Sequence, residues 1–212
     1  MHLRYSMIVS WSTNISGKAM GRKSTDKRAR LVQSAVKLFH LEGLQATSIA
    51  NIARDADVPV GNVFYYFRTK EDLVRAVVDH WLKRIDVALD SLLPDANPEL
   101  RLEAFLDASA SSADVYASVG CPLVGLARDL RLSDDSLAPL AGEMAARQCS
   151  WIGRLFEATG LNAADALIRA RSFLATLQGS FQLAFALRDP EIVHESIAAL
   201  KRHALGFEPG TR

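Results

Sequence analysis

Apolar residues recur at steps of three and four along almost the whole chain, and this periodicity constrains the fold more than any other feature. Between Thr25 and Glu42 the positions Leu31, Ala35 and Leu38 follow this step, which places them on one face of a helix. No segment shows the sustained alternation of a strand, and none carries an Asn-Gly type hairpin turn. The sequence therefore predicts an all-α fold of about nine helices.

Charge is unevenly distributed, although the 212 residues carry a formal net charge of only +1. Residues 1–70 hold 11 Lys and Arg against 4 Asp and Glu, whereas residues 71–212 hold 14 against 20. The basic part favours a polyanionic partner. Hydrophobic residues, at 49%, are too frequent for a disordered chain, and no apolar run is long enough to span a membrane. With only two cysteines, a reducing compartment is expected, and we predict a cytoplasmic protein with no membrane partner.

Three short helices are predicted within about forty residues, from Arg30 to Leu73. Thr47 is expected to cap the second helix, and the turn of residues 56–59 (ADVP) separates it from the third. Two short helices joined by a tight turn are typical of a helix-turn-helix, whose second helix enters the major groove of DNA. The aromatic run of residues 64–67 (FYYF) lies on that helix, where phenol hydroxyls can reach phosphates.

The segment resembles the DNA-binding domain of the TetR family of repressors. The resemblance is carried by residues 47–53 (TSIANIA) and 58–73 (VPVGNVFYYFRTKEDL), and it extends over about residues 26–78. It implies a homodimer that binds a palindromic operator in double-stranded DNA and is released by a small-molecule effector. We expect residues 1–22 to be a flexible N-terminal extension, with Met20 as an alternative start. Residues 23–70 would bind DNA, and residues 71–212 would bind the ligand and dimerise.

By position, the resemblance implies contacts to phosphates, to base edges and to the DNA backbone. The residues concerned are Lys27, Thr47, Ser48, Val60, Gly61, Asn62, Phe64, Tyr65, Tyr66 and Lys70. Two of them depart from the family pattern, which often has Tyr in place of Phe64 and Lys, Arg or Gln in place of Val60. Base readout should then depend on Asn62 and on DNA shape. The alternatives are that the aromatic run is core and that the basic residues are a solvated face.

A stretch of fifteen uncharged residues, Phe173–Leu187, predicts a helix buried on several sides. Together with the last helix it resembles the dimer interface of the family, although packing within one subunit is the alternative. The expected interface residues are Phe173, Leu177, Phe181, Ala184, Val193, Ile197 and Leu200. Before this stretch we predict a single helix over Pro98–Val119 that ends at Gly120.

The effector site is less sharply marked. Aromatic and polar residues at helical spacing make candidates of His80, Trp81, Phe105, Tyr116, Cys121, Trp151 and Phe181, although such residues are more often core. An apolar lining favours a hydrophobic effector. Cys121 precedes Pro122 at an expected helix start, where a thiolate is stabilised. The segment around it resembles a TetR branch with members that respond to electrophiles, so an electrophilic, thiol-reactive effector is a further hypothesis; the alternative is a buried apolar role.

An enzyme is the main competing class. No metal-ligand spacing, phosphate loop or nucleophile elbow occurs, and the five histidines are scattered. We therefore predict no enzyme activity, no catalytic residues, no metal and no cofactor. A helical adaptor for protein partners is a second alternative, which salt-dependent DNA binding would separate from a regulator. An activator in place of a repressor is a third.

Overall fold

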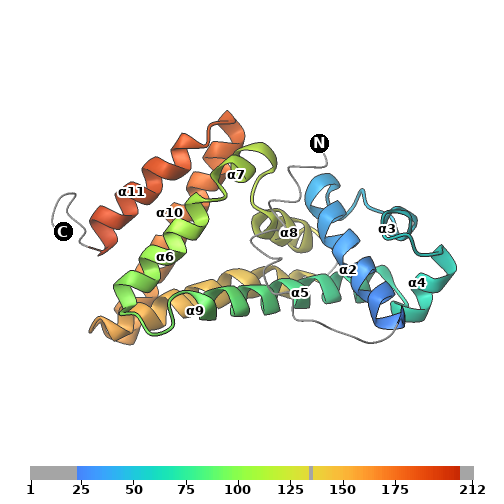
Figure 1. Cartoon of the computed structure of the whole chain (residues 1–212), viewed down its shortest axis with the longest axis horizontal. Coiled ribbons are helices and arrows are strands. Elements are labelled where there is room, and N and C mark those ends of the chain that lie inside the picture. The colour runs from blue at the N-terminus through green and yellow to red at the C-terminus, as the bar shows by residue number, and fades with distance from the viewer. Residues whose placement is uncertain (1–22, 134–135, 206–212) are drawn as a thin grey trace. The chain divides into compact units, whose positions relative to one another are not determined.

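The computed structural model describes residues 23–133 and 136–205, so the expected extension at residues 1–22 lies outside the described residues. Within them the chain is helical and no strand is present, as the periodicity predicted (Figure 1). The elements in order are α2 (Lys23–Glu42), α3 (Ile49–Asp55), α4 (Val60–Tyr66), α5 (Lys70–Ser91), α6 (Pro98–Ala110), α7 (Ala113–Val119), α8 (Pro122–Arg131), the 3-10 helix η1 (Ala138–Gly142), α9 (Glu143–Ala158), α10 (Ala163–Leu187) and α11 (Glu191–Leu205).

Two compact units make up the described chain. The first unit combines the residues up to Arg84 with Pro122–Met144, and the second combines Ile85–Cys121 with the residues from Ala145 onward. Helices α5 and α9 therefore contribute residues to both. Residues 122–144, which the sequence assigned with the C-terminal part, pack in the first unit. The functional division at residue 70 stays a prediction.

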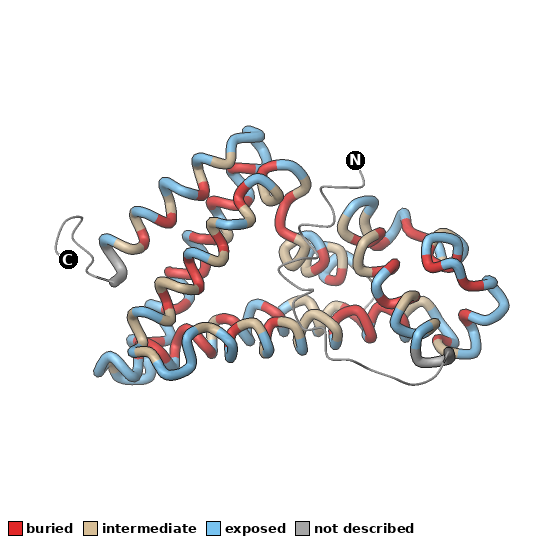
Figure 2. The backbone as a smooth tube through the Cα atoms, viewed as in Figure 1, coloured by how far each residue is buried: buried red, intermediate tan, exposed pale blue. Residues whose placement is uncertain are grey.

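The core of the first unit follows the helical stripe that the sequence indicated. Leu31, Ala35, Ile52 and Val63 are all fully buried, and Phe67 is buried beside them. Gly43 ends α2 with φ of 87°, a left-handed conformation that glycine adopts without strain, and its amide donates to the Phe39 carbonyl at 3.1 Å. Figure 2 shows this division between buried and exposed faces along each helix.

The second unit is built around α10, which packs against α7 and α11, while α11 also packs against α6. Its interior is aromatic: the ring centroids of Phe105 and Trp151 lie 5.8 Å apart, and those of Phe156 and Phe173 lie 6.0 Å apart. Lys201 on α11 bonds to Glu103 at 3.2 Å and to Asp107 at 2.6 Å on α6. These contacts fix α11 on α6.

The prediction of a single helix over Pro98–Val119 is wrong, because the structure divides this segment into α6 and α7. Consecutive serines explain the break. The Ser111 hydroxyl donates to the Ala108 carbonyl at 2.7 Å, and Ser112 is the N-cap residue of α7. Short hydroxyl side chains compete for backbone groups in this way and interrupt a helix that apolar spacing alone would continue.

Among the described residues, no helix combines the length and the apolar character needed to cross a membrane. Within the same residues, no group of three or more His, Cys, Asp or Glu is arranged to hold a metal ion.

Candidate nucleic-acid interface

The helix-turn-helix is formed by α3, a tight turn and α4. The Ser48 hydroxyl accepts from the Asn51 amide at 3.1 Å and caps α3. In the turn, Asp57 takes a left-handed conformation with φ of 51°, and the Val58 amide donates to the Ala53 carbonyl at 2.9 Å. These bonds fix where α4 begins relative to α3.

The prediction that Thr47 caps α3 is wrong, because the N-cap residue is Ser48. Thr47 is fully buried, and its hydroxyl donates to the Gly43 carbonyl at 2.8 Å. A buried hydroxyl already engaged with the backbone is not presented to a phosphate. The sequence could not separate the two neighbours, because Thr and Ser are both good caps. The only sequence feature that could have indicated the role of Thr47 is Gly43, four residues earlier, whose carbonyl the Thr47 hydroxyl contacts.

The outer face of α4 carries apolar and aromatic side chains that no other described element covers. Val60, Phe64 and Tyr65 are 44%, 54% and 83% exposed. Gly61 and Asn62 are exposed as well, whereas Val63 and Phe67 face the core. Large apolar side chains held outward on a rigid helix mark a surface that meets a partner. Six predicted DNA contacts, Val60, Gly61, Asn62, Phe64, Tyr65 and Tyr66, therefore lie together on one short helix.

Aromatic and basic side chains lie along the border of the exposed α4 face. The Tyr65 and Tyr66 rings meet edge to face, with centroids 5.0 Å apart. The Arg28 guanidinium lies 5.0 Å from the centroid of the Phe67 ring, which holds it near the end of α4. Lys27 is half-buried, and Arg68 is exposed directly after α4. Positive charge therefore adjoins the exposed aromatic face.

Lys70 is placed differently from the phosphate contact expected of it. Its ammonium donates to the Leu44 carbonyl at 2.6 Å. Burial lowers the pKa of Lys70 from its ordinary value, and the neighbouring Glu71 carboxylate opposes this shift. A phosphate contact would have to replace or share the bond to Leu44.

The seven ligand-site candidates are divided between the two units. His80 and Trp81 lie on α5 in the first unit, with ring centroids 6.2 Å apart. Burial lowers the pKa of His80 from 6.5 to about 4, and the charges of Arg84 and Lys83 act in the same direction. The other five candidates, Phe105, Tyr116, Cys121, Trp151 and Phe181, belong to the second unit.

Within the second unit these candidates form packed pairs. The Tyr116 and Phe181 rings are stacked with centroids 3.9 Å apart. Burial, together with the nearby Cys121 thiol, raises the pKa of Tyr116 above its ordinary value. Cys121 is buried, with 6% of its surface exposed, and Cys149 is half-buried. Burial of Cys149 raises the pKa of its thiol, and the Arg171 charge opposes this shift.

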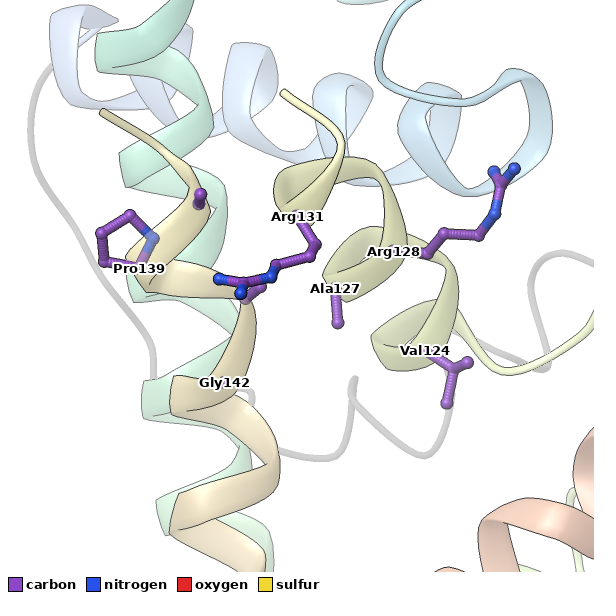
Figure 3. A pocket seen from close by; sticks show the side chains of 8 residues that line it. Val124, Ala127, Arg128, Arg131, Pro139 and Gly142 are labelled. Atoms are coloured by element: carbon purple, nitrogen blue, oxygen red, sulfur yellow. The ribbon is translucent and has the colours of Figure 1, made fainter. Parts of the chain in front are cut away.

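A surface groove that sequence reasoning missed lies in the first unit, with a volume of about 620 Å³. It runs between α8 and η1, and the Arg131 side chain reaches across it while Arg128 points away (Figure 3). The lining residues are Val124, Ala127, Arg128, Arg131, Ala138, Pro139, Ala141 and Gly142. None of the seven candidates is among them. No motif in the sequence marked this groove.

The seven residues expected at a dimer interface are all buried within the single chain. Phe173, Leu177, Phe181, Ala184, Val193, Ile197 and Leu200 fill the core of their own unit. The large apolar side chains that α10 does expose are Leu167, Ile168, Leu183, Phe185 and Leu187. A helix that is apolar on two faces gives no sequence signal for which face is inward, and packing against α7 and α11 decides it.

Comparison with known proteins agrees with this geometry. Residues 31–77 match the model of the bacterial regulatory proteins of the tetR family. The chain is 27% identical over 181 residues to an HTH-type transcriptional regulator in the lacX 3′ region of Lactococcus lactis, covering 82% of this chain and 91% of that protein. It is 34% identical over 84 residues to the regulator BetI of Proteus mirabilis, covering 38% of this chain and 42% of that protein.

Solved structures show the same fold. A TetR transcriptional regulator from Legionella pneumophila superposes with a TM-score of 0.74 at 20% identity, covering 87% of this chain and 98% of that one. The regulatory protein TetR from Rhodobacter sphaeroides does so with a TM-score of 0.73 at 20% identity, covering 84% and 98%. The exposed face of α4 and the family match agree: residues 31–77 form a helix-turn-helix segment of the tetR family of bacterial regulatory proteins, and the chain as a whole has the fold of the solved TetR regulators.

Proposed function

We propose that this chain is a repressor that binds a palindromic operator as a homodimer in the cytoplasm, with residues 23–70 as its DNA-binding domain. The single observation that carries the proposal is the outward face of α4, where Val60, Phe64 and Tyr65 are exposed over a buried core. Asn62 supplies an amide that can hydrogen-bond a base edge. Tyr65 and Tyr66 supply hydroxyls for phosphates, and the aromatic faces rest on sugars.

The test begins with selection of binding sites from random duplex DNA by the full chain. We expect an inverted repeat, since two recognition helices related by a two-fold axis read two half-sites. Affinity for the selected site, measured by fluorescence anisotropy, should fall steeply as salt rises, because phosphate contacts release counterions. Enrichment of no sequence, or a Kd that ignores salt, contradicts the proposal.

A matched pair of variants locates the interface. Tyr65→Ala should weaken operator binding by about tenfold or more, since a hydrogen bond to a charged phosphate contributes roughly 1.5–3 kcal/mol. Val87→Ala removes another exposed apolar side chain, on α5, and should leave the Kd within about twofold. Equal effects of the two variants would place the DNA elsewhere. Expression of a promoter fused to the selected site separates repression from activation.

We further propose that residues 71–212 dimerise and take a small-molecule or thiol-reactive effector. The large apolar side chains that α10 exposes support dimerisation, because several exposed apolar side chains on one element favour a surface that meets a partner. Sedimentation equilibrium of the full chain tests this, and a monomer at all concentrations contradicts it. For the effector, thermal-shift screening of hydrophobic compounds should find ligands that also release operator DNA. Ligands that raise the melting temperature without changing the operator Kd contradict the regulatory role.

A further inference from the structure

Leu44, in the connection between α2 and α3, is held by two side chains from different helices. Its amide donates to a carboxylate oxygen of Asp129 on α8 at 2.7 Å. Its carbonyl accepts from the Lys70 ammonium, at the start of α5, at 2.6 Å. Its own side chain is buried. We refer to Leu44, Asp129 and Lys70 as the Leu44 clamp.

The contact with α8 is close and has more than one bond. A Cβ added at Gly43 would lie 3.4 Å from the Asp129 carboxylate, an ordinary van der Waals distance, so α8 lies close to the loop at this point. Next in the chain, the side-chain amide nitrogen (Nε2) of Gln45 donates to the Ser133 hydroxyl at 3.2 Å. The Ser133 hydroxyl in turn donates to the Asp129 carbonyl at 2.7 Å. Asp129 on α8 and Ser133, directly beyond the helix, therefore hold two consecutive residues of the loop.

The clamp acts on the segment that begins the helix-turn-helix. Three residues after Leu44, the Thr47 hydroxyl bonds to the Gly43 carbonyl, and Ser48 then caps α3. A shift of the Leu44 backbone is thereby transferred to the start of α3 and through the turn to α4. The position of the Asp129 carboxylate is not explained by an ion pair with Arg128. The Arg128 guanidinium lies 3.5 Å from this carboxylate, on a side chain that is 73% exposed, and such surface pairs contribute little.

We propose that Asp129 is a positioning residue for DNA binding. By accepting from the Leu44 amide it fixes the position of the helix-turn-helix on α8. Any displacement of α8 that breaks this bond releases the loop and lowers operator affinity. Helix α8 starts at Pro122, directly after the last residue of a segment of the second unit, so the chain connects the clamp to that unit. The inference rests on the proposed operator binding.

The sign of the effect separates this role from simple electrostatics. Removing the Asp129 charge makes the protein more positive, which by itself strengthens binding to DNA phosphates. Loss of the clamp has the opposite effect. Asp129→Ala and Asp129→Asn remove the same charge, but the Asn carbonyl oxygen can still accept from the Leu44 amide.

The experiment compares Asp129→Ala, Asp129→Asn and Arg128→Ala in the full chain with the selected operator. We expect Asp129→Ala to weaken operator binding roughly tenfold or more, the range that loss of a hydrogen bond to a charged group allows. Asp129→Asn should recover most of the affinity. Arg128→Ala should stay within about twofold, since it removes only an exposed charge. Binding to non-operator DNA should weaken less than operator binding in Asp129→Ala.

Hydrogen exchange of the Leu44 amide reports the clamp independently of DNA. Protection should fall in Asp129→Ala and persist in Asp129→Asn. Faster Leu44 exchange with unchanged operator affinity would overturn the proposal, as would equal loss of affinity in the Ala and Asn variants. If Asp129→Ala does not fold, the operator affinities of Ser133→Ala and Asp129→Asn are compared with that of the wild type instead. A wild-type chain that binds no duplex refutes the proposed function itself, whereas a wild-type operator complex with an unaltered Asp129→Ala complex refutes only the clamp.

Discussion

Gly61, the second residue of α4, has open space where a side chain would be. A Cβ built there meets no atom within 4 Å. Packing within the chain therefore does not require glycine at this position, and a helix is generally more stable with alanine. Exposed and flanked by Val60 and Asn62, Gly61 leaves the backbone open to close approach by another molecule.

Gly61→Ala should separate folding from DNA binding. We expect the free energy of unfolding to stay the same or to rise by up to about 1 kcal/mol, because alanine has the higher helix propensity. Operator affinity should fall, since the added methyl group meets the DNA rather than the protein. Thermal unfolding and fluorescence anisotropy check the two halves. Unchanged affinity would show that DNA does not approach this residue.

His80 provides a prediction about pH. Its pKa is about 4 in the folded chain against an ordinary 6.5, so the folded state favours the neutral imidazole. As the pH falls below 6.5, protons bind the unfolded chain first and stability is lost, until the folded pKa near 4 is reached. Above pH 6.5 this contribution is fully present.

We therefore expect the free energy of unfolding to fall less between pH 7 and pH 5 in His80→Gln than in the wild type. Urea titrations at both pH values give the comparison. Direct titration of the imidazole by NMR should place its pKa well below 6.5. An imidazole that titrates near 6.5, with parallel loss of stability in both proteins, would contradict the burial argument.

Among the elements, α10 carries apolar residues on two faces that have different partners. Ala184 is fully buried toward the rest of its unit, while its neighbour Leu183 is 51% exposed. The inner face is occupied by packing against α7 and α11. The outer face is free to meet a second copy of the chain in the proposed dimer.

Aspartate placed on each face should give opposite results. Leu183→Asp should dissociate the dimer while leaving far-UV circular dichroism unchanged, because the charge replaces an exposed side chain. Ala184→Asp should destabilise the subunit by several kcal/mol, since it buries an unpaired charge. Sedimentation and thermal unfolding distinguish the two outcomes. As control, Leu132→Asp alters another exposed leucine, on the first unit, and should remain dimeric. A dimeric Leu183→Asp would place the interface on other residues.

The same contrast shows what the sequence could predict. Helical spacing predicted the buried Leu31, Ile52 and Val63, because a single apolar stripe has only one way to face a core. On α10 the apolar pattern did not show which face is inward. The residues that are buried within the subunit are ones that we had expected at the dimer interface. The cap assigned to Thr47 was wrong, and the bond that Lys70 makes within the chain was not predicted, for a different reason. Both side chains bond to backbone carbonyls, those of Gly43 and Leu44. Every residue has a backbone carbonyl, so the sequence does not indicate which one a side chain will contact.

At the scale of the whole molecule, two cysteines lie in different environments. Cys121 is buried in the second unit beside Tyr116, and Cys149 lies half-buried on α9. Burial raises the pKa of the Cys149 thiol, so it stays protonated and unreactive at neutral pH. If a thiol reports an effector, Cys121 is the candidate, and its reaction requires local opening.

Alkylation tests this on the intact regulator bound to its operator. We expect N-ethylmaleimide to release DNA from the wild type and from Cys149→Ser, but not from Cys121→Ser, because an adduct of the buried sulfur cannot fit without moving its neighbours. Modification should be far slower in the folded chain than in urea. Mass spectrometry identifies the modified cysteine. If the Cys121 adduct forms while the operator stays bound, the effector acts elsewhere.

The exposed Val60 and Phe64 of α4 have a consequence for the chemistry of the operator itself. Neither side chain can donate or accept a hydrogen bond, so each can recognise a base only by a methyl group in the major groove. Thymine carries such a methyl at C5, uracil lacks it, and 5-methylcytosine has it at the same place. Replacing thymines in each half-site by uracil should therefore weaken binding where these residues contact them, and methylated cytosine should restore it. With Val60 and Phe64 on base edges, we expect the proposed regulator to respond to base methylation without any residue dedicated to sensing it.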